Sequence, residues 1–108
     1  MEIESCQGDS IIIQSYDNHI STDTCNHITI KDCLLHDSKR QGISIVVGTN
    51  VTVDNCEIYN ISGADPQAGI DIEAETHPLD PSIDFVIIKN CYIHNTSGQS
   101  IVLGSYNG

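Results

Sequence analysis

Residues 28–33 read ITIKDC, and the same alternation ending in cysteine returns as VTVDNC at residues 51–56 and as VIIKNC at residues 86–91. Each copy is followed by two further short apolar alternations, so each unit predicts three short strands. The last alternation of each unit lies at residues 42–45, 69–72 and 100–103. An internal repeat of this kind is typical of a solenoid, in which stacked units bury a common core.

Composition supports an all-β fold of limited size. The chain has 108 residues, of which 39% are apolar, with one Phe and no Trp, which suffices for one small domain. Apolar residues recur with the two-residue period of strands, and no helical stripe accompanies them. We expect residues 1–108 to be a single β-helix domain or a fragment of a longer β-helix.

One repeat unit is longer than its neighbour. Cys33 and Cys56 are 23 residues apart, whereas Cys56 and Cys91 are 35 apart. The extra residues fall into two insertions, at residues 62–68 and 76–82, and the second contains prolines, as loops do. The two insertions bracket the third strand of this unit, so we expect loops on both sides of it.

The charge balance and the lack of long apolar runs limit the partners that the chain is expected to bind. Fifteen acidic residues against four basic ones give a net charge of −11, which opposes binding to nucleic acid. No apolar run approaches the roughly 18 residues of a membrane span, and no signal peptide is visible. The charge suits a neutral polysaccharide, divalent cations or an ordinary solvated surface.

Three of the five cysteines occupy one position of the repeat. Cys33, Cys56 and Cys91 should therefore stack in a column, about 4.8 Å apart per step. No CxxC pair exists, which argues against a zinc knuckle. We interpret the column as reduced, inward-facing thiols that pack as small hydrophobic groups.

The repeat resembles the right-handed parallel β-helix of the pectate lyase-like superfamily, over residues 26–108. The resemblance implies a right-handed parallel β-helix of about four coils and three short sheets. It also implies that Asp32, Asn55 and Asn90 form a ladder in the bend between the second and third sheets. Residues 42–45, 69–72 and 100–103 then form the first sheet, which in similar enzymes floors the polysaccharide groove.

Within that mapping, the run 71–75 supplies candidate catalytic residues. Strand alternation turns Asp71, Glu73 and Glu75 to one exposed face, while the residues between them point inward. Successive outward residues lie about 6.6–6.8 Å apart, close to the separation of the carboxyl pair in inverting glycosidases. Mutual repulsion should raise the pKa of one carboxyl, as a general acid requires.

Five further residues are candidates for substrate binding. Ser44 should lie beside Asp71 on the neighbouring coil, and Arg40 lies in the loop that enters the first sheet. His77 follows the acidic run, and Tyr16 and Tyr106 fall on the row of outward residues, where their rings could stack on sugars. His36, Tyr59 and His94 should instead form an outward column on the third sheet, away from the proposed groove.

The activity stays open among three interpretations. The first is a glycoside hydrolase or polysaccharide lyase; Arg40 is the only residue placed to be a lyase base, and the signature motifs of polygalacturonases are missing. The second is a non-catalytic structural or adhesive segment of a surface or phage tail protein. The third is a calcium site at Asp71, Glu73 and Glu75, since carboxylate oxygens are calcium ligands; no other cofactor is expected.

The resemblance also implies a partner, an oligomeric state and a location. Trimeric phage tailspikes and adhesins resemble this arrangement, and many of them cleave surface glycans. We therefore expect a polysaccharide or cell-surface glycan as partner, and either a homotrimer or a longer chain that covers the ends of the coil stack. The same resemblance implies an extracellular, cell-surface or virion location.

Overall fold

The computed structural model describes residues 1–14, 25–74 and 83–105, and these residues form eleven β-strands and no helix. Consequently, none of the described segments is a helix that could cross a membrane. The strands belong to three sheets. Sheet A contains β1 (Glu2–Glu4), β4 (Leu34–His36), β7 (Glu57–Ile61) and β10 (Tyr92–Thr96). Sheet B contains β2 (Ile11–Ile13), β5 (Ile43–Ile45), β8 (Ile70–Ala74) and β11 (Ile101–Ser105), and sheet C contains β3 (Asn26–Lys31), β6 (Gly48–Asp54) and β9 (Ile83–Lys89).

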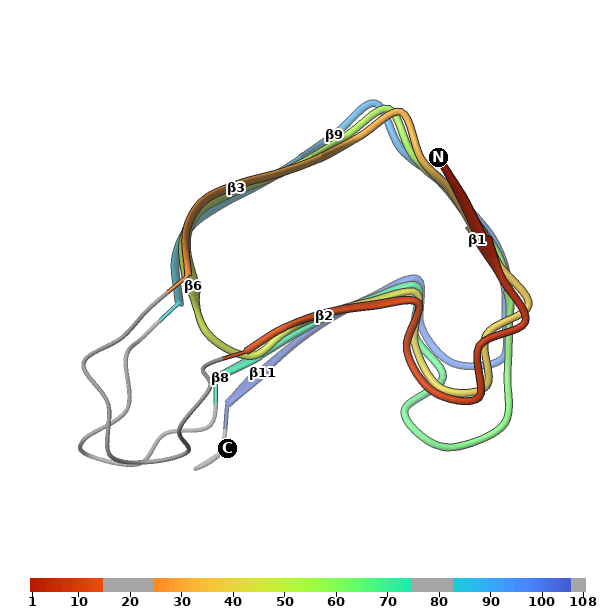
Figure 1. The fold of residues 1–108 in the computed structure, drawn as a ribbon. Helices are drawn as coiled ribbons and strands as arrows, with labels where there is room; N and C mark the ends of the chain where they lie inside the picture. The colour runs from red at the N-terminus through yellow and green to blue at the C-terminus, as the bar shows by residue number, and fades with distance from the viewer. Residues whose placement is uncertain (15–24, 75–82, 106–108) are drawn as a thin grey trace.

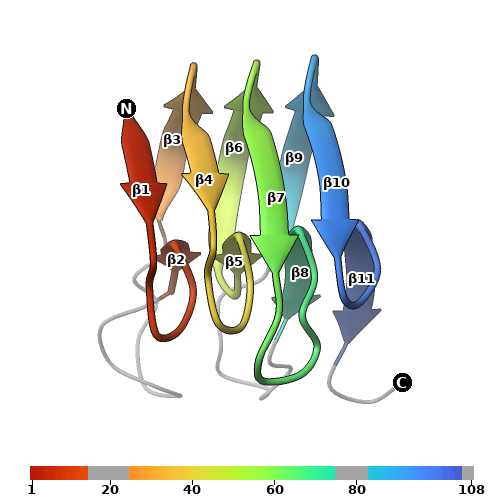
Figure 2. The ribbon, with the colours of Figure 1, turned by 90° about the vertical axis from the view of Figure 1, so that its right-hand side faces the viewer.

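The chain visits the sheets in the fixed order A, B, C, and each circuit forms one coil (Figure 1). Equivalent strands of successive coils lie side by side (Figure 2), and every pair is parallel. The register aligns Ile43 with Ile70 and Ile70 with Ile101. The fold is therefore a parallel β-helix of four coils, which confirms the predicted class; sheets B, C and A are the predicted first, second and third sheets.

Strand β1 was not predicted. Its three residues contain a single apolar side chain, Ile3, which is too little for a period to be visible. In the structure, Glu2 aligns with Leu34 and Glu4 with His36, so the first coil contributes to sheet A as well as to sheet B.

Aliphatic side chains from all three sheets fill the inside of the coils. Leu35, Ile43, Ile58 and Ile70 are fully buried, and each such side chain contributes roughly 1.5–3 kcal/mol to folding. Burial decreases toward the last coil, where Leu103 of β11 is 81% exposed because β11 is the outermost strand of sheet B.

The bend between sheets C and A uses the predicted ladder residues. Asp32, Asn55 and Asn90 have φ values of 56°, 54° and 55°, in the left-handed region that Asn and Asp tolerate. Asn55 Nδ2 donates to Asp32 Oδ1 at 2.7 Å, as a ladder requires. Asn90 departs from the prediction, because it donates to Asp54 Oδ1 at 3.1 Å instead.

The cysteine column has the predicted character. Cys56 is buried in the core cluster, and Cys33 and Cys91 are partly buried against it. All three are free thiols. Burial raises the pKa of the Cys56 thiol, which favours its uncharged form.

The connections from sheet A to sheet B swing out past sheet B, on the side away from the core (Figure 1). The third connection contains the predicted insertion 62–68 and stacks on the connection before it: Ser62 N–H donates to the Ser38 carbonyl at 3.1 Å and Ala64 N–H to the Lys39 carbonyl at 2.7 Å. The insertion at 76–82 lies outside the described residues. These stacked connections border the outer face of sheet B.

Candidate functional site

The candidate site lies on the outer face of sheet B, at the strand ends next to these connections. Ser44 of β5 and Val102 of β11 align with Asp71 of β8, as the sequence predicts. The strand alternation is also as expected, since the flanking Ile70 is buried in the core. Asp71 therefore projects away from the aliphatic interior.

Asp71 is nevertheless covered, which corrects the expectation of an exposed carboxylate. Its exposed fraction is 4%, because the connection of the preceding coil lies against it. Gln41, itself fully buried, donates from Nε2 to Asp71 Oδ2 at 2.8 Å and accepts from the Ala68 N–H at 2.9 Å. Gln41 thus holds the carboxyl in place and joins the second coil to the third.

A second buried carboxylate, Asp9, was not found from the sequence. Its side chain is 6% exposed, and its Oδ2 accepts from Ser44 Oγ at 2.8 Å and from the Arg40 guanidinium at 3.4 Å. Asp9 lies in the connection between β1 and β2, outside the repeat motif, so no sequence period marks it. Arg40 and Ser44, both predicted site residues, are thereby brought to the same carboxylate.

Each of these buried carboxylates has one oxygen that is unpaired among the described residues. Oδ1 of Asp9 and Oδ1 of Asp71 are buried, and neither makes a hydrogen bond to any of the described residues. A buried polar atom left unpaired costs about 1–3 kcal/mol. Both atoms belong to residues next to Ser44, which donates to Asp9 and aligns with Asp71.

The electrostatic environment sets the protonation of Asp71. Burial is the main cause that raises the pKa of Asp71 from 3.8 to about 6, and the neighbouring Glu73 raises it further by sharing the proton and by repulsion. The positive charge of Arg40 acts against this increase, and Asp9 adds to it. The raised pKa agrees with the sequence prediction for one carboxyl, but burial contributes more than repulsion.

Glu73 is the other predicted catalytic residue that the structure describes. It is exposed on β8, aligned with Gly104, and it is the neighbouring carboxyl that raises the pKa of Asp71. Glu75, His77, Tyr16 and Tyr106 lie outside the described residues, so their proposed roles stay predictions, as does the calcium site.

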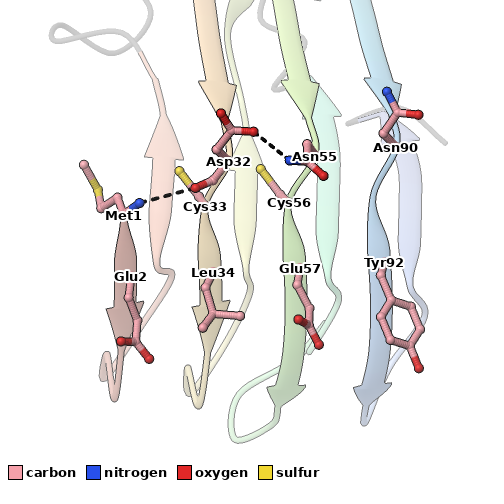
Figure 3. Close-up of a pocket in the computed structure, with 10 residues that line it drawn as sticks. All are labelled: Met1, Glu2, Asp32, Cys33, Leu34, Asn55, Cys56, Glu57, Asn90 and Tyr92. Atoms are coloured by element: carbon pink, nitrogen blue, oxygen red, sulfur yellow. Dashed lines mark hydrogen bonds between the residues drawn. The ribbon is translucent and has the colours of Figure 1, made fainter.

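A shallow depression on the opposite part of the molecule does not contain these groups. It lies where sheet C turns into sheet A (Figure 3), and its walls include the ladder residues Asp32, Asn55 and Asn90 and the outward side chains Glu57 and Tyr92. Most of this lining belongs to the scaffold of the bend. We therefore place the candidate site at the buried carboxyls of sheet B.

The predicted ring column is present on sheet A. The rings of His36 and Tyr59 stack at 4.8 Å and those of Tyr59 and His94 at 5.0 Å. His36 differs from His94 in its surroundings, because three carboxylates contact its ring: Glu2, Glu4 and Asp37. Hydrogen bonds to Asp37 and then to Glu2 are the largest causes that raise the pKa of His36 above 6.5. The sequence prediction missed this cluster because it missed β1.

Comparison with known proteins agrees with the architecture. Residues 1–108 match the protein family described as "Right handed beta helix region". The chain therefore belongs to the right-handed β-helix family, which also gives the coil its hand. No curated protein and no solved structure matched the chain. One fold serves many functions, so membership of this family does not by itself define an activity.

Proposed function

We propose that this β-helix processes a polysaccharide on the outer face of sheet B, with Asp71 as the proton donor. The observation that supports this proposal is a buried carboxyl with a pKa of about 6, held by Gln41 beside the exposed Glu73. An acid with a pKa near the working pH is partly protonated and still transfers its proton readily. Glycosidases raise the pKa of their general acid in the same way.

The reaction we propose is hydrolysis of a glycosidic bond. Asp71 protonates the oxygen of the leaving sugar as the bond between that oxygen and the anomeric carbon breaks. Glu73, the exposed member of the pair, takes a proton from the water that attacks the anomeric carbon. The sugar and the attacking water bind between Asp71 and Glu73, so that the acid and the base act on opposite sides of the bond that breaks.

Asp9 and Ser44 are proposed to orient the sugar. Oδ1 of Asp9 accepts a hydrogen bond from a sugar hydroxyl, which relieves the cost of leaving it unpaired, whereas Oδ1 of Asp71, whose other oxygen accepts from Gln41, carries the proton that is donated. The Arg40 guanidinium lies 3.4 Å from Asp9 and forms an ion pair with it. Because of this ion pair, Arg40 is less suited to act as the base of a lyase. Hydrolysis is therefore preferred over elimination, and a surface glycan as substrate fits an extracellular or virion location.

The test compares variants on a panel of neutral and acidic cell-surface polysaccharides. We expect Asp71→Asn and Glu73→Gln each to lower the cleavage rate by roughly 10²–10⁴-fold, the range of general acid–base catalysis. Reducing-end release measures hydrolysis, and the ultraviolet absorbance of an unsaturated product reports elimination. Asp84→Asn is the matched control, because Asp84 is an exposed carboxylate on sheet C.

Two results would contradict the assignment. Cleavage that is unchanged in Asp71→Asn and Glu73→Gln removes these residues from the chemistry. Binding of a glycan by the wild-type protein without any cleavage would favour the adhesive role instead, in which the same face of sheet B recognises the polysaccharide and leaves it intact.

A further inference from the structure

A second cluster of ionisable side chains lies on the outer face of sheet A, on a different sheet from Asp71. His36 Nε2 lies 2.7 Å from Glu2 Oε2 and 3.3 Å from Glu4 Oε2. The one nitrogen and the two carboxylate oxygens all lie within 4.8 Å of one another. Three side chains from two coils thus converge on a single point.

The strand register brings the three residues together. Glu4 aligns with His36 and Glu2 with Leu34, and β1 and β4 lie side by side (Figure 2). Because side chains alternate along a strand, Glu2 and Glu4 project from the same face of β1, with Ile3 turned inward. Figure 3 shows Glu2 on this outer face, beside Leu34 and Glu57 of the next two coils.

The imidazole of His36 is held in one orientation. Its side chain is 10% exposed, and the ring of Tyr59 stacks on it with an angle of 1° between the planes. Asp37 contacts the other ring nitrogen, Nδ1. A carboxylate on Nδ1 is the usual outer partner of a histidine that binds a metal through Nε2, because it fixes the ring and makes Nε2 a stronger ligand.

The charges of the cluster do not balance. Three carboxylates surround one imidazole, and no Lys or Arg of the described segments forms an ion pair with them. One N–H on Nε2 can form a strong hydrogen bond with one carboxylate at a time, whereas two compete for it. The same column offers a comparison in His94, which among the described residues has a single carboxylate partner, Glu57, at 2.8 Å.

We propose that Glu2, Glu4 and His36 bind a divalent cation of the zinc type, which ties the first coil to the second. In a tetrahedral zinc site the ligand atoms lie about 2.0–2.2 Å from the metal and hence roughly 3.3 Å from one another. The 2.7 and 3.3 Å separations at Nε2 need only small side-chain movements to reach this geometry. The cation replaces the proton on Nε2, and water fills the fourth position.

The test is a zinc titration of the full chain, purified without a histidine tag, freed of metal by a chelator and kept reduced. We expect calorimetry to show one zinc ion per chain and thermal unfolding to shift upward by several degrees. Glu2→Gln and Glu4→Gln should each weaken binding at least tenfold. Asp37→Asn should weaken binding by roughly 10- to 100-fold, as the loss of an outer partner does. These three residues are exposed, so the variants remain folded.

The controls separate this site from other zinc ligands. Glu57→Gln and His94→Gln should bind zinc as the wild type does, and any thermal shift caused by calcium should be the same in Glu2→Gln as in the wild type, since calcium prefers oxygen ligands alone. The proposal is overturned if the wild type binds no zinc, or if Glu2→Gln and Glu4→Gln bind it unchanged. Loss of binding in Cys33→Ser with full binding in Glu2→Gln would place the ion at the thiol column instead.

Discussion

At the scale of the residue, the surroundings of Asp71 decide its chemistry. The carboxyl faces Glu73 on its own strand, Asp9 on the first coil and Arg40 on the second, and the guanidinium is the only one of these groups that favours its charged form. Burial and two neighbouring carboxylates outweigh the single guanidinium. The folded protein therefore binds a proton at Asp71 more tightly than the unfolded chain does.

The stability of the protein should consequently depend on pH through Asp71. The pKa is 3.8 in the reference state and about 6 in the folded state, so ionisation costs stability progressively as the pH rises through this window. Below the window the cost is absent, and above it the cost is complete. We expect Asp71→Asn, which cannot ionise, to be more stable than the wild type at neutral pH by on the order of 2 kcal/mol.

Urea unfolding of both proteins across the window measures this difference, which should shrink toward zero at the acidic end. Asp84→Asn serves as the control, because its carboxylate is exposed and its removal should leave the pH profile of the wild type unchanged. A constant difference between wild type and Asp71→Asn at every pH would contradict the assigned pKa.

At the scale of the structural element, the connections between sheets A and B determine which groups are buried. Gln41 in the second connection bridges to the third through the Ala68 N–H and to β8 through Asp71. Gln99 occupies the equivalent position before β11 and is exposed. Two glutamines in one repeat position thus have different roles, because only one of them is followed by a coil that contains Asp71.

Gln41→Leu should destabilise the protein, since it removes a buried bridge while keeping the volume. The Ala68 N–H and Asp71 Oδ2 both lose a partner, and each unpaired buried group costs about 1–3 kcal/mol. Gln99→Leu is the matched control and should change stability by less than about 0.5 kcal/mol. Equal effects of the two substitutions in chemical unfolding would argue against the bridge.

At the scale of the whole molecule, burial is concentrated in the two middle coils. Equivalent positions of sheet A show this: Leu35 and Ile58 are fully buried, whereas Ile3 and Ile93 in the outer coils are half-buried. Each coil contacts only its neighbours, so stability is distributed along the stack in the way of repeat proteins.

A matched pair of substitutions tests this distribution. Ile58→Ala should cost about 2–5 kcal/mol, because it opens a cavity between two covered coils. Ile93→Ala removes the same atoms from the same column but should cost about 1 kcal/mol, since its side chain is already partly solvated. Equilibrium unfolding in denaturant compares the two, and a larger loss for Ile93→Ala would contradict the distribution.

The repeat motif predicts the scaffold because each of its positions obeys a local rule. Alternation predicts the inward isoleucines, and Asn or Asp before the cysteine predicts the left-handed bend. The cover over Asp71 and the position of Asp9 follow from connections that do not repeat, so no period reveals them. Glu2 and Glu4 were missed for a different reason, because a strand of three residues is too short to show a pattern.

The proposed site on sheet B draws one member from each of three successive coils: Asp9, Ser44 and Asp71. Duplication of the middle coil would preserve every type of strand pairing and would lengthen the stack, yet it would move Asp9 and Asp71 apart by about another 4.8 Å. Loss of that coil would remove Ser44 and Gln41 together. The number of repeats in this part of the gene is therefore constrained by the spacing of three side chains, although the fold itself tolerates any number.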